Sequence, residues 1–207
     1  MNQILTLEGL NFTTVELHQS EHIFTLTLNR PAKKNAINEV MVNEIIYALD
    51  YAKQEDSIRV VVIAAKGDIF CAGGDLKAMS GQVDGPISNV PKRGEMEDVS
   101  LRLYHLNKPT LAKIQGSVFA GALTLVCNCT HAIAASHAQF SAPEILRGLW
   151  PFQVMAGLFR VMPKRAGLDF IMRGQRISAD QAAQHGLINE SAKADALDER
   201  VAALAAE

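Results

Sequence analysis

Two glycine-containing loops are the parts of this chain whose residue types and spacing are best suited to chemistry. The first contains Gly73 and Gly74 and comes shortly after a continuous apolar run at residues 60–65. The second spans residues 116–121 and comes after the apolar residues 110–114. Buried parallel strands have continuous apolar runs, so each loop is predicted to follow a strand and to lead into a helix.

A glycine loop at the start of a helix has two properties that matter for catalysis. The first backbone N–H groups of a helix have no intrahelical acceptor, and glycine lets a ligand approach the backbone closely. Two such loops that face one another would direct two N–H groups at a single oxygen and stabilise an oxyanion there. The same residues also fit two ordinary turns, and the spacing alone leaves both interpretations open.

Composition excludes several other classes of function. The chain has 207 residues, 48% of them hydrophobic and 20% charged, with a formal net charge of -2. These values are typical of a globular protein of one domain and give no reason to expect nucleic acid or a membrane as a partner. Without a secretory signal at the N-terminus we expect a cytoplasmic protein. Its three cysteines have the spacing of neither a disulfide framework nor a zinc site, so we expect no bound metal.

Local patterns predict strands and helices that alternate along the chain. Alternating residues 24–28 predict a strand that pairs as a hairpin with residues 15–17, with a turn at residues 18–21. Asn38 is suited to cap the following helix. A further helix opens at Phe119, and residues 132–135 and 139–140 are extended. More helices are expected at residues 154–161, 163–173, 178–186 and 194–207. This alternation indicates an α/β protein.

One segment lacks any such periodicity. Residues 80–94 contain many turn-forming residues and few regularly spaced apolar ones. A connection of this length is uncommon in a compact domain, so this segment is predicted to be either a mobile lid or a disordered loop.

Five segments in a fixed order resemble the crotonase superfamily, the enoyl-CoA hydratase/isomerase family. The resemblance extends from about residue 15 to residue 189. It rests on LNRP with NA (residues 28–36), FCAGGDL (70–76), the glycine loop at 116–121, QF with PEI (139–145), and GQRISA with AA and GLI (174–188). It implies a crotonase-like spiral of β-β-α turns, assembled as homotrimers or hexamers. It also implies an acyl-CoA thioester as the substrate, so that coenzyme A arrives with the substrate and no separate cofactor is needed.

The resemblance also divides the chain and assigns catalytic positions. Residues 1–190 correspond to the spiral core, and residues 191–207 to the start of a C-terminal helical region that is short beside that of other members. Such a short end implies either a truncation or a different oligomer. Gly74 and Gly121 match the backbone donors of the oxyanion hole, and Glu144 matches the second of two catalytic glutamates. The first glutamate position falls at Thr124, which cannot act as a carboxylate acid or base.

Further positions match the family's binding surface for the substrate. Lysines placed to meet the phosphates of coenzyme A are Lys33, Lys34 and Lys77, although each also fits a solvated surface. The edge that receives adenine and pantetheine matches Ala72, Gly73, Asp75 and Leu76. Trp150, together with Phe152, stands where many members carry glycines. These bulky side chains either reshape the acyl pocket or belong to the core.

A single retained glutamate leaves several reactions open. A lone carboxylate can remove a proton from one carbon and return it to another, which is the logic of 3-enoyl to 2-enoyl isomerisation. Hydration remains open if Thr124 positions a water and Glu144 acts alone as acid and base. The alternatives are decarboxylation of an acyl-CoA and a non-catalytic acyl-CoA-binding protein. Turnover that depends on Glu144 distinguishes an enzyme from a binding protein.

Overall fold

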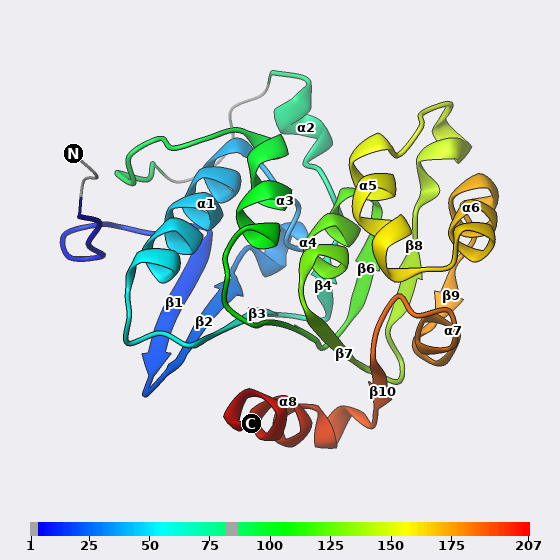
Figure 1. Cartoon of the computed structure of the whole chain (residues 1–207). Helices are drawn as coiled ribbons and strands as arrows, with labels where there is room; N and C mark the ends of the chain where they lie inside the picture. Colours follow the sequence, from blue (N-terminus) through cyan, green and yellow to red (C-terminus); the bar gives the residue numbers. More distant parts are fainter. Residues whose placement is uncertain (1–3, 82–86) are drawn as a thin grey trace.

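The computed structural model describes residues 4–81 and 87–207, which form two β-sheets with helices around them (Figure 1). The larger sheet has the order β1-β2-β3-β5-β7-β10, with the strands Val15–Ser20, Ile23–Leu28, Val60–Ala65, Thr110–Ile114, His131–Ala135 and Glu190–Ala192. The smaller sheet has the order β4-β6-β8-β9, with the strands Ile69–Cys71, Ser117–Phe119, Gln139–Ser141 and Ile177–Ser178.

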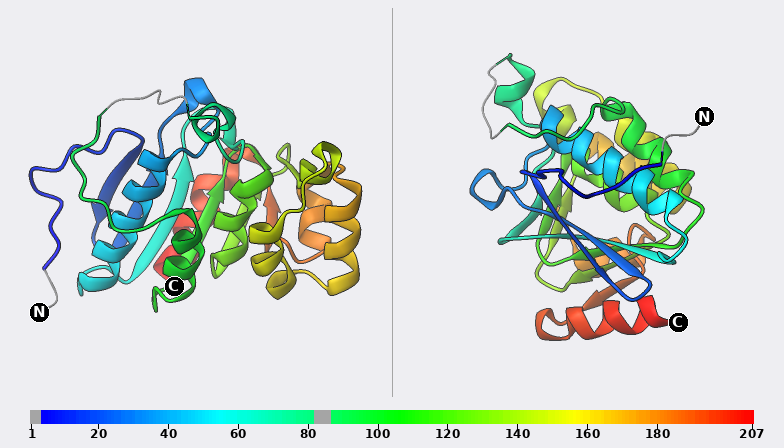
Figure 2. Two further views of the ribbon diagram at one scale, coloured as in Figure 1. Left: turned by 90° about the horizontal axis from the view of Figure 1, so that it is seen from above. Right: turned by 90° about the vertical axis from the view of Figure 1, so that its left-hand side faces the viewer.

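The helices are α1 (Glu39–Gln54), α2 (Leu76–Met79), α3 (Met96–Tyr104), α4 (Leu123–Asn128), α5 (Phe152–Val161), α6 (Lys164–Arg173), α7 (Ala179–Gln184) and α8 (Leu197–Ala206). Short 3-10 segments are η1 (Pro31–Lys33), η2 (Ala120–Ala122), η3 (Pro143–Arg147) and η4 (Ala194–Ala196). Helices α1, α3, α4 and α5 lie on one side of the larger sheet, and α8 lies on the other (Figure 2). Within the described part of the chain, no helix has the length and apolar character needed to cross a bilayer.

Successive β-β units pass from one sheet to the other. In the pairs β3–β4, β5–β6 and β7–β8, the first strand joins the larger sheet and the second joins the smaller one. Strands β3, β5 and β7 are parallel neighbours, and so are β4, β6 and β8. The loops at the ends of β4, β6 and β8 therefore meet at one edge. The predicted α/β spiral of β-β-α turns is confirmed.

The first hairpin is longer than its alternating pattern predicts. Strand β1 continues to Ser20, which pairs with Ile23, so the turn is Glu21-His22 rather than residues 18–21. Glu21 has a φ of 51°, the left-handed conformation that two-residue hairpin turns require. The predicted turn was wrong because the end of β1 is exposed and polar, and thus lacks the apolar half of a strand pattern.

The first long helix forms as predicted. The Asn38 side chain accepts the Met41 N–H at 3.0 Å and caps α1. The apolar face of the helix is buried and consists of Met41, Ile45, Ala48, Leu49 and Ala52. The helical region predicted from Phe119 begins one residue later: Phe119 ends β6 and is the N-cap of η2, which leads into α4 at Leu123.

The long irregular segment has two parts. Residues 82–86 lie outside the described residues, so the lid or disorder prediction is not addressed there. Residues 87–94 have no regular structure, but they are attached to α1: the Asn43 amide donates to the carbonyl oxygens of Val90 and Pro91 at 3.0 and 3.2 Å. Arg93 also pairs with Asp50 at 2.7 Å. This attached part forms a wall beside α1.

The C-terminal residues pack on the larger sheet. Strand β10, which the sequence patterns did not predict, pairs with β7. Helix α8 then covers the sheet face opposite α1 (Figure 1), where Leu197 and Val201 join a second apolar cluster with Val62, Leu111 and Ile133. The division of the chain at residue 190 and the trimeric or hexameric assembly stay predictions.

Candidate active site

The loops after β4 and β6 lie against each other, because these strands are parallel neighbours in the smaller sheet. Gly73 makes the closest approach. A β-carbon built on it would lie 2.8 Å from the Ala120 Cβ and 2.9 Å from the Phe119 carbonyl oxygen. Its φ of +90° is also a conformation that other residues rarely adopt. A glycine at this position therefore allows the two loops to touch.

The first loop directs the Gly74 N–H toward the second loop. Gly74 forms a parallel bridge with Ile37. In that bridge the Ile37 N–H donates to the Gly73 oxygen and the Asp75 N–H donates to the Ile37 oxygen, each at 2.8 Å. The N–H of the intervening Gly74 faces away from Ile37, because ladder groups alternate in direction. A β-carbon built on Gly121 would lie only 3.9 Å from the Gly74 nitrogen.

The second loop supplies the other N–H group. Ala120 has a φ of 54°, an uncommon conformation for a residue with a side chain, and there the chain turns from β6 into η2. Gly121 follows in the first turn of η2, where N–H groups have no intrahelical acceptor. Among the described residues, neither the Gly74 nor the Gly121 N–H donates to a protein acceptor. Two free donors this close together suit the stabilisation of an oxyanion.

Glu144 lies at the start of η3 and lines the same cleft as these two glycines. Its Oε2 atom is buried and has no hydrogen-bond partner among the described residues. Burial raises the pKa of the carboxyl group above its usual value, while the residue's own backbone amide and the Arg147 charge offset part of the rise. A half-buried carboxylate with an unoccupied oxygen can accept a proton and return it.

The cleft has a volume of about 1160 Å³ and runs between α1, the loop after β4, the segment before α3, and η3. The predicted site residues that line it are Lys33, Ala72, Gly74, Asp75, Leu76, Lys77, Gly121 and Glu144. The structure thus brings together both glycine donors, the glutamate and two of the three predicted lysines. Within the described residues, no cluster of histidine, cysteine, aspartate and glutamate could hold a metal ion.

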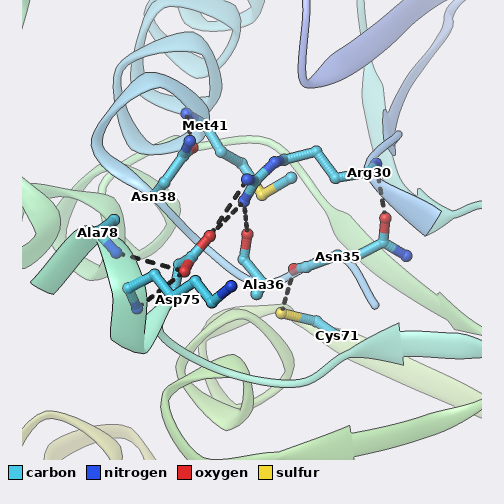
Figure 3. Close-up of polar contacts among 9 residues, drawn as sticks. Arg30, Asn35, Ala36, Asn38, Met41, Cys71, Asp75 and Ala78 are labelled. Carbon is cyan, nitrogen blue, oxygen red and sulfur yellow. Dashed lines mark hydrogen bonds and ion pairs between the residues drawn. The ribbon is translucent and has the colours of Figure 1, made fainter. Parts of the chain in front are cut away.

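Asn35 fixes the loop that precedes α1 (Figure 3). It is fully buried, and its φ of 52° is left-handed. Its side-chain oxygen accepts the Arg30 N–H at 2.8 Å. Its side-chain nitrogen donates to the carbonyl oxygens of Lys66 and Ile69 at 2.8 and 2.9 Å. This amide therefore ties the loop to the chain segment that leads into β4.

Arg30 and Asp75 hold the first glycine loop in place (Figure 3). Both terminal guanidinium nitrogens of Arg30 donate to the Asp75 Oδ2 atom at 3.1 Å, and Arg30 also donates to the Ala36 carbonyl. Asp75 also caps α2, accepting the N–H groups of Lys77 and Ala78 at 3.2 and 3.4 Å.

Burial acts to raise the pKa of Asp75, but hydrogen bonds from Ala78 and Arg30 outweigh it and lower that pKa. The carboxylate is thus occupied in shaping the loop, and its predicted contact with coenzyme A stays a prediction.

Four predicted site residues lie outside the cleft lining. Lys34 is exposed and accepts the Ala72 N–H through its carbonyl at 3.0 Å, and Gly73 is enclosed between the two loops. Thr124 is buried in α4, and its hydroxyl has no partner among the described residues. Trp150 packs against the core, whereas the Phe152 side chain is 69% exposed. Their binding or catalytic roles stay predictions.

Two groups of cleft residues went unnoticed in the sequence. Asn43 and the segment before α3 form one wall, with Ser88, Val90 and Met96 in the lining. On the opposite side, Arg147 follows Glu144 in η3 and also lines the cleft. A polar residue inside the apolar pattern of α1 was the available signal for Asn43. No periodic signal marks the irregular segment.

Comparisons with known proteins agree with this geometry. A family model described as enoyl-CoA hydratase/isomerase matches residues 18–207. The chain is 33% identical over 190 residues to a hydroxycinnamoyl-CoA hydratase-lyase of Pseudomonas fluorescens, covering 90% of this chain and 68% of that protein. It is 31% identical over 176 residues to a 2,3-dehydroadipyl-CoA hydratase of Escherichia coli (strain K12), covering 83% and 66%.

Solved structures show the same likeness. An enoyl-CoA hydratase of Mycobacterium smegmatis superposes with a TM-score of 0.85 at 31% identity, covering 93% of this chain and 75% of that one. The chain spans 57% to 72% of the length of the curated relatives it matches.

Proposed function

The chain belongs to the enoyl-CoA hydratase/isomerase family of the crotonase superfamily, and from this premise we propose that it acts on acyl-CoA thioesters with Glu144 as its single proton-transfer group. The Gly74 and Gly121 N–H groups would donate to the thioester oxygen. The negative charge that develops there on proton removal would thereby be stabilised. The observation that carries the proposal is the unpartnered, buried Glu144 Oε2 in the same cleft as both free N–H groups.

The proposed reaction is isomerisation of a 3-enoyl to a 2-enoyl thioester. Glu144 takes a proton from C2, the electrons form a dienolate held by the two N–H groups, and Glu144 returns the proton to C4. The double bond moves from C3–C4 to C2–C3, and the carboxylate is regenerated. A raised pKa makes Glu144 a stronger base for the first step. Among the other carboxylates in the lining, Asp75 is paired with Arg30 and Glu95 with Lys92, whereas Glu39 and Glu97 are exposed.

Hydration of a 2-enoyl thioester is the second candidate, and one observation favours it. The buried Thr124 hydroxyl has no partner among the described residues and could hold a water. Glu144 would then remove a proton from that water while its oxygen adds to C3, and would deliver the proton to C2. Two relatives described above carry hydratase in their names, which adds support for this candidate.

The experiment is a substrate panel with products read by mass spectrometry. Purified protein receives 2-enoyl-CoA and 3-enoyl-CoA thioesters of several chain lengths. The Glu144→Gln variant is assayed beside it. A matched control is Glu97→Gln, which changes another glutamate of the cleft lining. We expect the double bond to shift without addition of water, and this shift to disappear in Glu144→Gln but not in Glu97→Gln.

Other outcomes would redirect the proposal. Added water, lost in Glu144→Gln, would replace isomerisation with hydration. Turnover that survives in Glu144→Gln would overturn the role of this glutamate. Thioester binding without turnover of any panel member would favour a decarboxylase or a non-catalytic binding protein.

A further inference from the structure

A second charged side chain of the cleft lies one helical turn from Glu144. Glu144 and Arg147 both belong to η3 (Pro143–Arg147), and both line the cleft. In a 3-10 helix, side chains three residues apart are eclipsed, so these two side chains lie on the same side of η3. Three residues advance about 6 Å along such a helix.

The Arg147 guanidinium is available to a ligand. Among the described residues it forms no hydrogen bond or ion pair with the protein. By contrast, Arg30, Arg93 and Arg102 each contact a carboxylate at 2.7 to 3.1 Å. The positive charge of Arg147 nevertheless reaches the reaction site, because it lowers the pKa of Glu144 against the effect of burial.

The position of Arg147 places it nearer to the acyl part of a bound thioester than to the coenzyme A part. The thioester oxygen would lie at Gly74 and Gly121, and the lysines of the lining, Lys33 and Lys77, belong to the segments around the Gly74 loop. Arg147 belongs to the Glu144 side of the cleft, on the same short helix as the residue that would exchange protons with C2 and C4. A guanidinium there could meet a group farther along the acyl chain.

We propose that Arg147 binds a carboxylate carried by the acyl group, so that CoA monothioesters of short dicarboxylic acids are the favoured substrates. Guanidinium groups hold carboxylates through two parallel hydrogen bonds, which a neutral acyl end cannot form. The offset of about 6 Å along η3 suits acyl groups whose carboxylate carbon is one or two carbons beyond C4. This inference rests on the proposed function, because it places the thioester by the oxyanion donors.

A phosphate of coenzyme A has related chemistry and is the rival source of the anion. Binding measurements on different thioesters distinguish an acyl carboxylate from a coenzyme A phosphate. An acyl carboxylate makes the effect of Arg147 specific to the dicarboxylic thioester. A coenzyme A phosphate makes the effect equal for all thioesters and dependent on the 3′-phosphate.

The test measures binding rather than turnover. Isothermal titration calorimetry gives the Kd of saturated thioesters that cannot react, in pairs with equal carbon number: glutaryl-CoA with valeryl-CoA, and adipyl-CoA with hexanoyl-CoA. The 3′-dephospho form of each is measured as well. The variants are Arg147→Gln and Arg147→Lys. The control is Arg165→Gln, an exposed arginine of α6 that is not in the cleft lining.

We expect the protein to bind one dicarboxylic thioester about tenfold or more tightly than its neutral partner, the size of a charge-assisted hydrogen bond. Arg147→Gln should abolish this preference without changing the Kd of the neutral thioester. Arg147→Lys should keep part of it, since the charge remains but the planar fork is lost. Arg165→Gln should leave it unchanged.

Three results would overturn the inference. Equal Kd values within both pairs for the unaltered protein would remove the preference. An equal loss for both members of a pair in Arg147→Gln, absent with the 3′-dephospho forms, would assign Arg147 to the phosphate. If Arg147→Gln still prefers the dicarboxylic thioester, another residue must bind the acyl carboxylate. The proposed function fails separately, if the preference is found but no enoyl-CoA is turned over. If no thioester binds at all, both fail.

Discussion

Two glutamates with buried carboxylate oxygens show how differently this molecule uses the same side chain. Glu44 of α1 is fully buried and accepts five hydrogen bonds, from the N–H groups of Thr13, Thr14 and Val15 and from both threonine hydroxyls, at 2.5 to 3.2 Å. Glu144 of η3 has a buried Oε2 with no partner among the described residues. The protein satisfies the first carboxylate completely and leaves the second ready to react.

The difference has a physical cause. A buried carboxylate is costly unless donors surround it, and once surrounded it holds those donors in one geometry. Glu44 thereby fixes the start of β1 on α1. At Glu144 the missing donors leave the cost of desolvation in place, which appears as a raised pKa. Perturbed carboxylates of this kind are typical of catalytic sites.

Glu144→Gln should remove activity without lowering stability, which tests the catalytic half of this comparison. We expect kcat to fall about 10²- to 10⁴-fold, the range of a lost general acid–base. The midpoint of denaturant unfolding should stay equal or rise, because the amide removes a desolvated charge. Steady-state kinetics and urea titration of the same preparation measure both quantities. A large loss of stability together with activity would show that Glu144 is a structural residue like Glu44.

Glu44→Gln should break the contrast on the side of stability. The amide cannot accept from every donor that now surrounds the carboxylate, and each buried donor left unpaired costs about 1–3 kcal/mol. We expect the free energy of unfolding to fall by about 3 kcal/mol or more. The remaining folded protein should keep its kcat.

The control for this change is Glu39→Gln, an exposed glutamate in the first turn of the same helix. It should shift the free energy of unfolding by about 1 kcal/mol or less. A Glu44→Gln variant as stable as the Glu39→Gln variant would contradict the structural role of the five hydrogen bonds.

The pH dependence of activity should sharpen the comparison. Because burial raises the pKa of Glu144, its ionised form appears at higher pH than that of an ordinary glutamate. We expect kcat/KM to rise about tenfold per pH unit below that pKa and then to level off. Arg147→Gln should move this limb to higher pH, since Arg147 lowers the pKa. An acid limb at the ordinary glutamate pKa, or one that Arg147→Gln leaves in place, would contradict this assignment.

The free energy of unfolding should also depend on the ionisation of Glu144, but it should fall with rising pH where kcat/KM rises. The folded pKa lies above the unfolded one, so the stabilising contribution is fully present below the unfolded pKa. It is lost as pH rises through the folded pKa. The Glu144→Gln variant should therefore gain stability relative to the unaltered protein over that interval, which urea titrations at several pH values will show.

Local signals in the sequence were sufficient for most of the fold. Asn38 caps α1 as predicted. Ser178 and Gln181 form a capping box at the start of a predicted helix, and Gly174 ends α6 with a φ of +59°. The prediction failed where few residues carry the pattern: the exposed end of β1 and the three-residue strand β10.

Within the site, the sequence could reveal the residues whose backbone conformation is special. The glycine loops and Glu144 were predicted, and they share one cleft. The wall beside α1 could not be foreseen, because Asn43 fixes Arg93 by a hydrogen bond across 50 residues of sequence. Likewise, Glu44 and Glu144 differ in the number of hydrogen-bond donors around them, and the local sequence does not reveal how many donors the fold brings to each carboxylate.

Thr124→Val should give the smallest effect. It tests whether the unpartnered Thr124 hydroxyl has a structural role, like Glu44, or a catalytic role, like Glu144. The Thr124 hydroxyl is buried without a protein partner, so a methyl group of similar shape removes an unsatisfied polar atom. We expect stability to be unchanged or to rise by about 1 kcal/mol. Thr124→Ser keeps the hydroxyl and serves as the control. If isomerisation is the reaction, both variants should keep kcat within about twofold, since no water takes part. A large loss of hydration in Thr124→Val, with activity retained in Thr124→Ser, would show that the hydroxyl holds a reacting water and belongs with Glu144.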